Sequence, residues 1–180
     1  HLCDSDMWHG IPGAATGESG SGKSTACLVG CSIFGNPSKM MVPANSEGTT
    51  MNALIQRTST MRHLPILMDE ITGRKTEEMQ ALLFALSNGR PKKRLRSDGT
   101  ELDFGESWDM MGMITGNTNM TRMLAESDRL RADASQVRVF EIKFTRKDNE
   151  ALFRDITGKS DIEKDILADQ YGTVGREFLR

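Results

Sequence analysis

The stretch that decides the fold is Gly17-Glu18-Ser19-Gly20-Ser21-Gly22-Lys23-Ser24, which matches the pattern G-x-x-x-x-G-K-[ST] at every fixed position. Glycine tolerates positive φ angles, so this backbone can turn successive N–H groups inward around an anion. Lys23 would bring a positive charge to the β- and γ-phosphates of a nucleotide, and the Ser24 hydroxyl would ligate Mg²⁺. Thr25 follows, and a helix beginning at residue 23 would direct its positive end at the same phosphates. The stretch predicts a binding loop for ATP and Mg²⁺ over residues 17–25.

A flexible Gly/Ser linker is the alternative interpretation of this stretch. A linker would not place Lys-Ser-Thr immediately before the run Ala-Cys-Leu-Val at residues 26–29, which continues as a helix. We therefore favour the phosphate-binding loop.

Cys27 and Cys31 are four residues apart on that helix and could pair as soft metal ligands. The three His residues stand at positions 1, 9 and 63, so no third or fourth ligand is at hand. We expect both Cys side chains to be small buried core residues.

Composition restricts the class of protein. The chain has 180 residues, 37% apolar and 27% charged, as expected for one globular domain with a sizeable core. Its net charge of −2 gives no global argument for nucleic acid binding. No apolar run approaches the roughly 20 residues of a membrane span, the start lacks signal-peptide features, and three Cys suggest a reducing compartment. We expect a cytoplasmic location and no membrane partner, and the missing initiator Met suggests a fragment of a longer protein.

Short apolar runs alternate with amphipathic stretches, which is typical of an α/β layer fold. Strands are expected over residues 11–16, 39–42, 65–68, 110–115 and 137–144, and helices over 23–34, 50–61, 77–86 and within 149–179. The buried stripe of the third helix is Met79, Leu82, Leu83 and Leu86. A turn signal, Ser97-Asp98-Gly99, predicts a β-hairpin within 90–107. We expect a three-layer P-loop NTPase fold with a parallel sheet over residues 1–146, the hairpin as an insertion, and 147–180 as a C-terminal helical extension of the same domain.

Two acidic residues, Asp69 and Glu70, directly follow the continuous apolar run of residues 65–68. Such a run is typical of a buried parallel strand, and parallel sheets present ligands at the carboxyl ends of their strands. Asp69 would hold the Mg²⁺ hydration shell, and Glu70 would orient or deprotonate the attacking water. The alternative is a helix N-terminus that carries acids because of the helix dipole. The position of Asp69, 46 residues after Lys23, favours the catalytic interpretation.

A polar residue also ends the strand expected over 110–115, where the sequence continues Thr115-Gly116-Asn117. Asn117 could hydrogen-bond the γ-phosphate or the attacking water, which is a sensor role. Asn119 is the rival for this role, and either Asn is also ordinary turn chemistry.

This ordered set of motifs resembles the additional-strand ATPases, particularly the AAA+ proteins and the superfamily 3 helicases. The resemblance implies an additional-strand sheet and ATP hydrolysis. The expected hairpin stands where superfamily 3 helicases carry a DNA-contacting hairpin. By this resemblance the DNA-binding residues are the cations of its first arm, Lys92, Lys93, Arg94 and Arg96.

Residues 135–144, Ser-Gln-Val-Arg-Val-Phe-Glu-Ile-Lys-Phe, resemble the superfamily 3 segment whose Arg enters the neighbouring subunit's active site. By that match Arg138 is the arginine finger, and Arg129 and Arg131 are less well placed. A finger that acts in trans implies a homo-oligomer, most simply a hexameric ring.

The whole chain also resembles a domain of unknown function found in phage and plasmid primase–helicases. The resembling pieces are residues 20–25 (GSGKST), 52–54 (NAL), 67–70 (LMDE), 88–90 (NGR), 96–99 (RSDG), 136–138 (QVR) and 171–175 (YGTVG). This resemblance implies the motor domain of a DNA helicase or primase–helicase acting on single-stranded DNA.

The main rival class is an oligomeric AAA+ ATPase that remodels or loads a protein partner. The basic arm discriminates the two, because a protein-translocating pore usually carries an aromatic residue rather than Lys or Arg. A solvated charged arm without a role stays open. A GTPase is disfavoured because no Asn-Lys-x-Asp motif is present.

Overall fold

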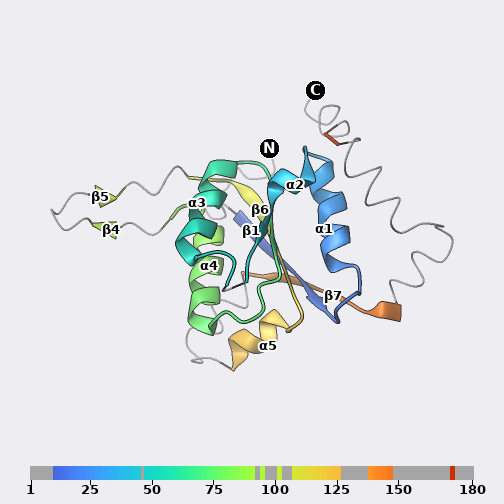
Figure 1. Ribbon diagram of the computed structural model, residues 1–180. Helices are drawn as coiled ribbons and strands as arrows, with labels where there is room; N and C mark the ends of the chain where they lie inside the picture. Colours follow the sequence, from blue (N-terminus) through green and yellow to red (C-terminus); the bar gives the residue numbers. More distant parts are fainter. Residues whose placement is uncertain are drawn as a thin grey trace.

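A computed structural model describes residues 10–45, 47–91, 94–95, 101–102, 107–126, 138–147 and 171–172. Its centre is a five-stranded sheet in the order β2-β3-β6-β1-β7 (Figure 1). The strands are β1 (Gly10–Gly17), β2 (Met41–Pro43), β3 (Ile66–Asp69), β6 (Met110–Gly116) and β7 (Phe140–Phe144). Every neighbouring pair in this sheet is parallel. The predicted parallel sheet is therefore confirmed.

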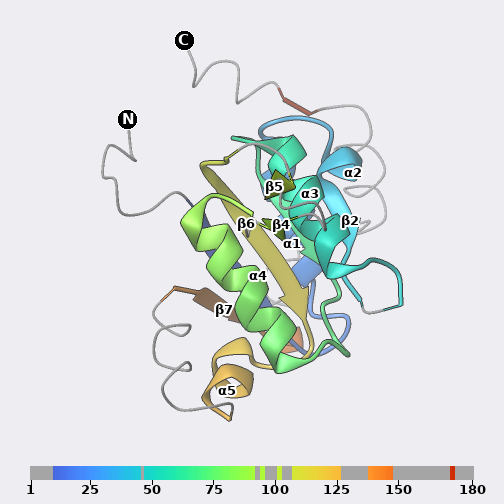
Figure 2. The same ribbon diagram turned by 90° about the vertical axis from the view of Figure 1, so that its left-hand side faces the viewer.

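Helices cover both faces of the sheet. They are α1 (Lys23–Ser32), α2 (Pro37–Met40), α3 (Met51–Met61), α4 (Thr76–Asn88) and α5 (Met120–Ala125). Figures 1 and 2 show α1 on one face of the sheet and α3 and α4 on the other, which gives the three predicted layers. None of the helices within the described part of the chain is long and apolar enough to cross a membrane.

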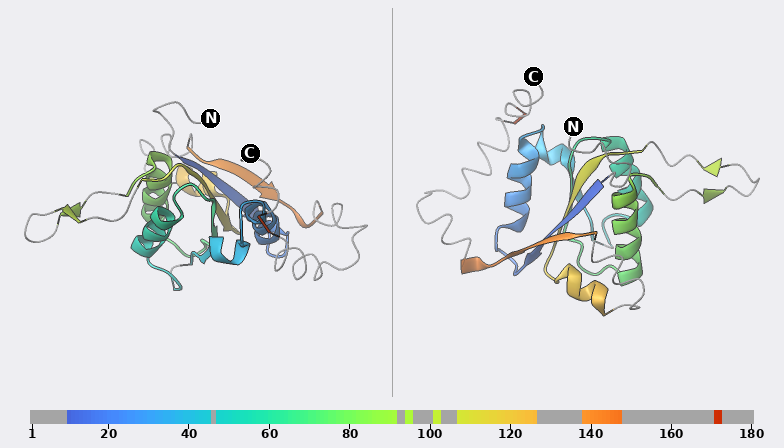
Figure 3. Two further views of the ribbon diagram at one scale, coloured as in Figure 1. Left: turned by 90° about the horizontal axis from the view of Figure 1, so that it is seen from above. Right: turned by 180° about the vertical axis from the view of Figure 1, so that it is seen from behind.

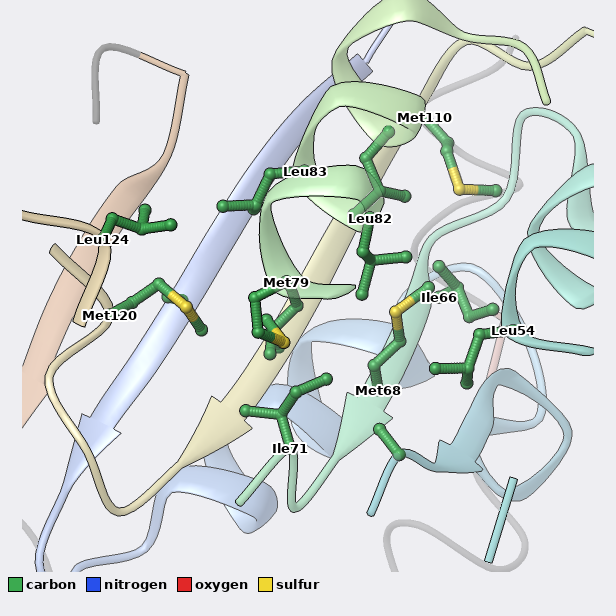
Figure 4. Close-up of a cluster of buried hydrophobic side chains, with 14 of the residues drawn as sticks. Leu54, Ile66, Met68, Ile71, Met79, Leu82, Leu83, Met110, Met120 and Leu124 are labelled. Atoms are coloured by element: carbon green, nitrogen blue, oxygen red, sulfur yellow. The ribbon is translucent and has the colours of Figure 1, made fainter. Parts of the chain in front are cut away.

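Two apolar cores hold the layers together, because neighbouring residues of a strand point to opposite faces. Ala14 and Met68 belong to the larger core, whereas their neighbours Ala15 and Leu67 belong to the smaller core with Cys27 and Cys31. The larger core contains the predicted stripe of α4, Met79, Leu82, Leu83 and Leu86, each at most 1% exposed. Figure 4 shows Met79, Leu82 and Leu83 among the side chains of this core.

The strand order places β6 between β1 and β3. Gly13 of β1 is paired with Met113 of β6, and Met113 is paired in turn with Leu67 of β3. Because the strands are parallel, β1, β6 and β3 all end at the same edge of the sheet. That edge carries residue 17, residue 116 and residue 69 together, and it is where the predicted site residues meet.

Several element boundaries differ from the prediction. Residues 39 and 40 belong to the short helix α2 rather than to a strand, because Pro37 starts a helical turn that the Asn36 side chain caps by accepting the Ser38 N–H at 3.0 Å. Helix α1 ends at Ser32 instead of residue 34. Strand β7 begins at Phe140, and residue 137, the predicted start, lies outside the described residues. So do the helices expected within 149–179, except for residues 171–172.

The predicted hairpin is present as a separate two-stranded antiparallel sheet of β4 (Arg94–Leu95) and β5 (Glu101–Leu102). Its base is fixed to the carboxyl end of α4 by Trp108, which is 1% exposed. The Trp108 backbone N–H donates to the Gly89 carbonyl at 2.7 Å, and its indole N–H donates to the Leu86 carbonyl at 3.3 Å. Figure 3 shows β4 and β5 standing apart from the five-stranded sheet.

Strand β1 is rich in Gly and Ala because its neighbours approach its backbone closely. A Cβ atom at Gly10 would lie 2.1 Å from the Leu86 carbonyl oxygen of α4, and one at Gly13 would lie 2.6 Å from the Met113 sulfur. The missing side chains let α4 pack directly on the strand that carries the phosphate-binding loop.

Replacing Gly10 by Ala should therefore lower the free energy of unfolding by roughly 1–3 kcal/mol, the usual cost of overpacking. Gly30 in α1 is the matched control, because a Cβ there meets nothing within 4 Å. Gly30→Ala should raise stability by about 0.5–1 kcal/mol through helix propensity. Urea denaturation of the three proteins measures both effects. Equal midpoints for Gly10→Ala and the wild type would show that α4 does not pack this closely.

Candidate active site

The loop between β1 and α1 has the backbone that its glycines predict. Gly20 has φ 74° and Gly22 has φ 86°, both in the left-handed region that glycine adopts readily. Gly17 has φ 143°, and a Cβ there would lie 2.0 Å from the Phe144 carbonyl oxygen. The sequence strand–loop–helix with these angles is the geometry of a phosphate-binding loop, and a linker is excluded.

The Lys23 ammonium group lies inside this loop and is held by four oxygen atoms. It donates to the Glu18 carbonyl at 2.7 Å, the Gly17 carbonyl at 3.0 Å, the Asn117 side-chain oxygen at 3.2 Å and the Ser21 hydroxyl at 3.5 Å. Lys23 is only 7% exposed. The loop lysine and one predicted sensor residue are thus in direct contact.

The two candidate sensor residues have different surroundings. Asn117 contacts Lys23, whereas the Asn119 side chain caps α5 by accepting the Arg122 N–H at 2.6 Å. A capping oxygen is already used by the backbone. Of the two, Asn117 is the residue that the fold brings to the phosphate-binding loop.

Asp69 is the last residue of β3, and one of its oxygens, Oδ1, joins three elements. It accepts a hydrogen bond from the Ser24 hydroxyl of α1 and another from the Thr115 hydroxyl of β6, both at 2.6 Å. Helix α4 begins only at Thr76, so the acids end a strand rather than start a helix. Ser24 and Asp69, the two predicted metal-binding residues, are therefore neighbours.

Glu70 follows Asp69 with a left-handed backbone of φ 58°, which is uncommon for a residue other than Gly, Asn or Asp. Its N–H donates to the Thr115 hydroxyl oxygen at 2.9 Å. Among the described residues its carboxylate has no hydrogen-bond partner, and the residue is partly exposed. The backbone of Glu70 is held in an unusual conformation while its carboxylate stays available, a combination that is common at functional sites.

Thr115 is a site residue that the sequence interpretation did not single out. It is 1% exposed, its hydroxyl hydrogen bonds Asp69, and its hydroxyl oxygen accepts from Glu70. The only sequence signal was its place two residues before Asn117 at the end of a strand.

Two Arg residues near this edge were also missed. Arg146 follows β7, and its Nε donates to the Ser19 carbonyl of the loop at 3.2 Å and lies 3.7 Å from the Glu18 carboxylate.

The Arg74 side chain is 3% exposed and connects the loop after β2 to the start of α4. It donates to the carbonyls of Ala44 (2.6 Å), Asn45 (3.1 Å) and Thr49, and to Glu78 (3.3 Å).

Cys27 and Cys31 are buried free thiols on the sheet-facing side of α1. Burial, with smaller contributions from Cys31 and Asp69, raises the pKa of Cys27 to about 12, and burial raises the pKa of Cys31 to about 11. No group of three His, Cys, Asp or Glu residues suited to a metal occurs in the described ranges. The geometry agrees with core residues.

Arg138 lies against α4 of its own chain. Its guanidinium carbon is 4.6 Å from the centroid of the Phe84 ring, and its Nη1 donates to the Asn88 side chain at 3.3 Å. Both of these partners belong to α4, and neither is a residue of the loop 17–24. The alternatives Arg129 and Arg131, and the arm residues Lys92, Lys93 and Arg96, lie outside the described residues, while Arg94 is placed in β4.

The chain is similar to parts of larger solved structures. One is described as the active helicase Cch of SCCmec type IV, with a TM-score of 0.62 and 24% identity over 96% of this chain. A second is Hsp104 of S. cerevisiae in complex with ADP, with a TM-score of 0.49 and 16% identity over 91% of this chain. The chain spans 29% of the helicase chain and 34% of the Hsp104 chain. At this identity the helicase match establishes the fold, a P-loop NTPase domain.

No curated protein matches the chain significantly. A protein-family model, described as domain of unknown function DUF927, matches residues 10–102. That range is more than half of the 180 residues, and it contains the phosphate-binding loop, the Asp-Glu strand end and the hairpin strands β4 and β5. The chain is therefore a P-loop NTPase domain that belongs to the DUF927 family.

Proposed function

We propose that this chain binds ATP with Mg²⁺ and hydrolyses it as the motor domain of a DNA helicase or primase–helicase of a phage or other mobile element. The observation that carries the proposal is the meeting of Lys23, Asn117, Ser24, Asp69 and Glu70 at one edge of the sheet. The Lys23 Nζ donates to Asn117 Oδ1 at 3.2 Å, and the Ser24 hydroxyl donates to Asp69 Oδ1 at 2.6 Å. These residues come from the ends of β3 and β6 and from the start of α1.

The loop suits a triphosphate because the Lys23 charge and the N–H donors of the loop would lie around the same anion. A phosphate oxygen would compete with the carbonyls of residues 17 and 18 for the Lys23 ammonium group, which offers only three N–H donors to four oxygens. A charge-assisted hydrogen bond from the ammonium group to phosphate is stronger than one to a backbone carbonyl. The exchange would release the loop backbone and leave Lys23 bound to the anion.

The Ser24 hydroxyl and the Asp69 carboxylate offer the oxygen ligands that Mg²⁺ prefers. Bound there, Mg²⁺ would neutralise charge on the β- and γ-phosphates. Thr115 also donates a hydrogen bond to the Asp69 carboxylate, which would help the acid to keep its place when Ser24 turns to another partner. The donor set therefore fits the ion.

Glu70 would take the proton of the attacking water. It lies one residue beyond Asp69, its backbone is held by Thr115, and its carboxylate is unpaired among the described residues. Asn117, beside Lys23, would hydrogen-bond the γ-phosphate or the same water. The water oxygen would bond to phosphorus as the bond to ADP breaks.

The hairpin supports DNA as the substrate on which the motor acts. Lys92, Arg94 and Arg96 alternate in the sequence of its first arm, and on a strand residues two apart would share one face. The base of the hairpin is held to α4 by Trp108, which connects it to the core behind the site. In a hexameric ring, six such arms would give a channel the positive field that a net charge of −2 does not.

Replacing Lys92 and Arg94 together by Ala should weaken binding of single-stranded DNA and flatten its salt dependence. Each phosphate contact contributes a slope of about −0.7, so the slope should fall by roughly one to two units. Basal ATP hydrolysis should survive, because neither residue belongs to the nucleotide site. Fluorescence anisotropy of a labelled oligonucleotide over a salt series measures the slope.

The matched control is the double variant Lys39→Ala and Arg122→Ala, which removes the same charge from exposed positions on α2 and α5. Its DNA affinity and salt slope should match the wild type. If the hairpin variant also matches the wild type, the arm is a solvated face and a protein-remodelling ATPase becomes the better explanation.

A further inference from the structure

Glu141 of β7 is a partly buried carboxylate that accepts four hydrogen bonds, two on each oxygen. Oε1 accepts from the Thr16 hydroxyl at 2.6 Å and from the Met120 N–H at 2.9 Å. Oε2 accepts from the Thr121 N–H at 3.0 Å and from the Thr121 hydroxyl. A single side chain therefore joins the strand β1 to the first residues of α5.

The register of the sheet explains this position. Ala14 is paired with Glu141 and Thr16 with Lys143, so Glu141 and Thr16 are diagonal neighbours on one face of the sheet. Helix α5 packs on that face through Met120 and Leu124, both in the larger core. Figure 3 shows β7 beside β1.

The two segments that Glu141 joins also contain residues that accept hydrogen bonds from the Lys23 ammonium group. Thr16 immediately precedes Gly17, whose carbonyl accepts from Lys23. Met120 and Thr121 follow Asn117, whose side chain also accepts from Lys23. Lys23 and Glu141 thus each link the same pair of segments through hydrogen bonds.

The four hydrogen bonds that Glu141 accepts require an ionised carboxylate. Burial acts to raise the pKa of Glu141, but the hydrogen bonds from Thr121, Thr16 and Met120 outweigh it and the pKa is lowered. A glutamine amide has one accepting oxygen and an NH₂ group that can only donate. That NH₂ group would leave one backbone N–H, of Thr121 or of Met120, without an acceptor, whereas the Thr hydroxyl beside it can turn and accept from it.

We infer that Glu141 is a positioning residue for Asn117, holding the segment 117–121 against the strand of the phosphate-binding loop so that Asn117 stays beside Lys23. The inference rests on the proposed ATP hydrolysis for its kinetic consequence. Its structural consequence, the anchoring of residues 117–121, does not depend on that activity.

Two measurements on Glu141→Gln test the inference. Hydrogen–deuterium exchange of the Met120 and Thr121 amides should become faster. One of the two amides would lose its acceptor, and the other would donate to a neutral amide oxygen, which is a weaker acceptor than a carboxylate oxygen. The kcat for ATP should fall by about 10- to 100-fold, a typical cost of misplacing a reacting group, with little change in KM. In an Asn117→Ala background the same substitution should change kcat by less than about 2-fold, because a positioning residue acts only through the group that it positions.

Glu126→Gln is the matched control, because Glu126 is an exposed acid just after α5 that pairs with Arg122. It should leave both exchange and kcat unchanged. Thr121→Ala, which removes one of the four hydrogen bonds, gives the same test with a milder change if Glu141→Gln does not fold.

Unchanged exchange at residues 117–121 would overturn the inference, and so would an equal loss of kcat with and without Asn117. If the wild type hydrolyses no ATP, the proposed function fails, while the exchange measurement still decides whether Glu141 anchors the segment.

Discussion

Replacing Glu70 by Gln should lower ATP hydrolysis by about 100-fold or more, the usual loss when a general base is removed, while ATP binding is retained. Glutamine keeps the size of the side chain but cannot accept the proton of the attacking water. Its backbone can keep the hydrogen bond to Thr115, so the loop should stay in place. Single-turnover hydrolysis and binding of a fluorescent ATP analogue measure the two properties separately.

Two variants frame this result. Lys23→Ala should weaken nucleotide binding itself, because it removes the positive charge that three loop residues and Asn117 hold inside the loop. Glu77→Gln, an exposed acid in the first turn of α4, should leave both properties unchanged. Hydrolysis by Glu70→Gln at the wild-type rate would show that the Asp-Glu pair has been assigned the wrong role.

Replacing Arg138 by Ala should abolish turnover and leave ATP binding intact if Arg138 is the finger of a ring. Such a charge stabilises the phosphoryl-transfer transition state and is worth roughly 10³–10⁵ in rate. In the single chain Arg138 lies on Phe84 and Asn88 of α4, away from its own phosphate-binding loop. As a finger, Arg138 would act on a neighbouring subunit. Arg122→Ala, at an exposed arginine of α5, is the control and should keep wild-type turnover.

Mixing the inactive variants distinguishes a role in trans from a role within the chain. The Arg138→Ala subunit keeps its Glu70, and the Glu70→Gln subunit keeps its Arg138. Where the first supplies Glu70 and the second supplies Arg138 to the same site, that site contains both intact residues. Mixtures should therefore recover part of the activity that each variant lacks. No recovery at any ratio would mean that Arg138 supports α4 of its own chain.

The sequence predicted the phosphate-binding loop and the acid pair because both depend on local constraints. Left-handed backbone at Gly20 and Gly22 requires glycine, and a buried parallel strand requires the apolar run before Asp69. These constraints act within a few residues, so the sequence pattern is sufficient to show them.

The sequence did not reveal the residues that join strands far apart in the chain. Thr115 and Asp69 are 46 positions apart, and Glu141 and Thr16 are 125 apart, as the hydrogen bonds between them show. Their roles depend on which strands become neighbours and in which register. The Gly and Ala content of β1 had the same origin, because the close approach of α4 at Gly10 follows from helix packing and not from local preference.

The proposed function depends on ATP hydrolysis at the loop 17–24. Steady-state ATP turnover by the unmodified chain with Mg²⁺, at several protein concentrations and with or without single-stranded DNA, tests it most directly, with Lys23→Ala as the background. Turnover should rise more than proportionally with protein concentration, should be stimulated by DNA, and should be lost in Lys23→Ala. Turnover that is absent at every concentration, or unchanged in Lys23→Ala, would contradict it.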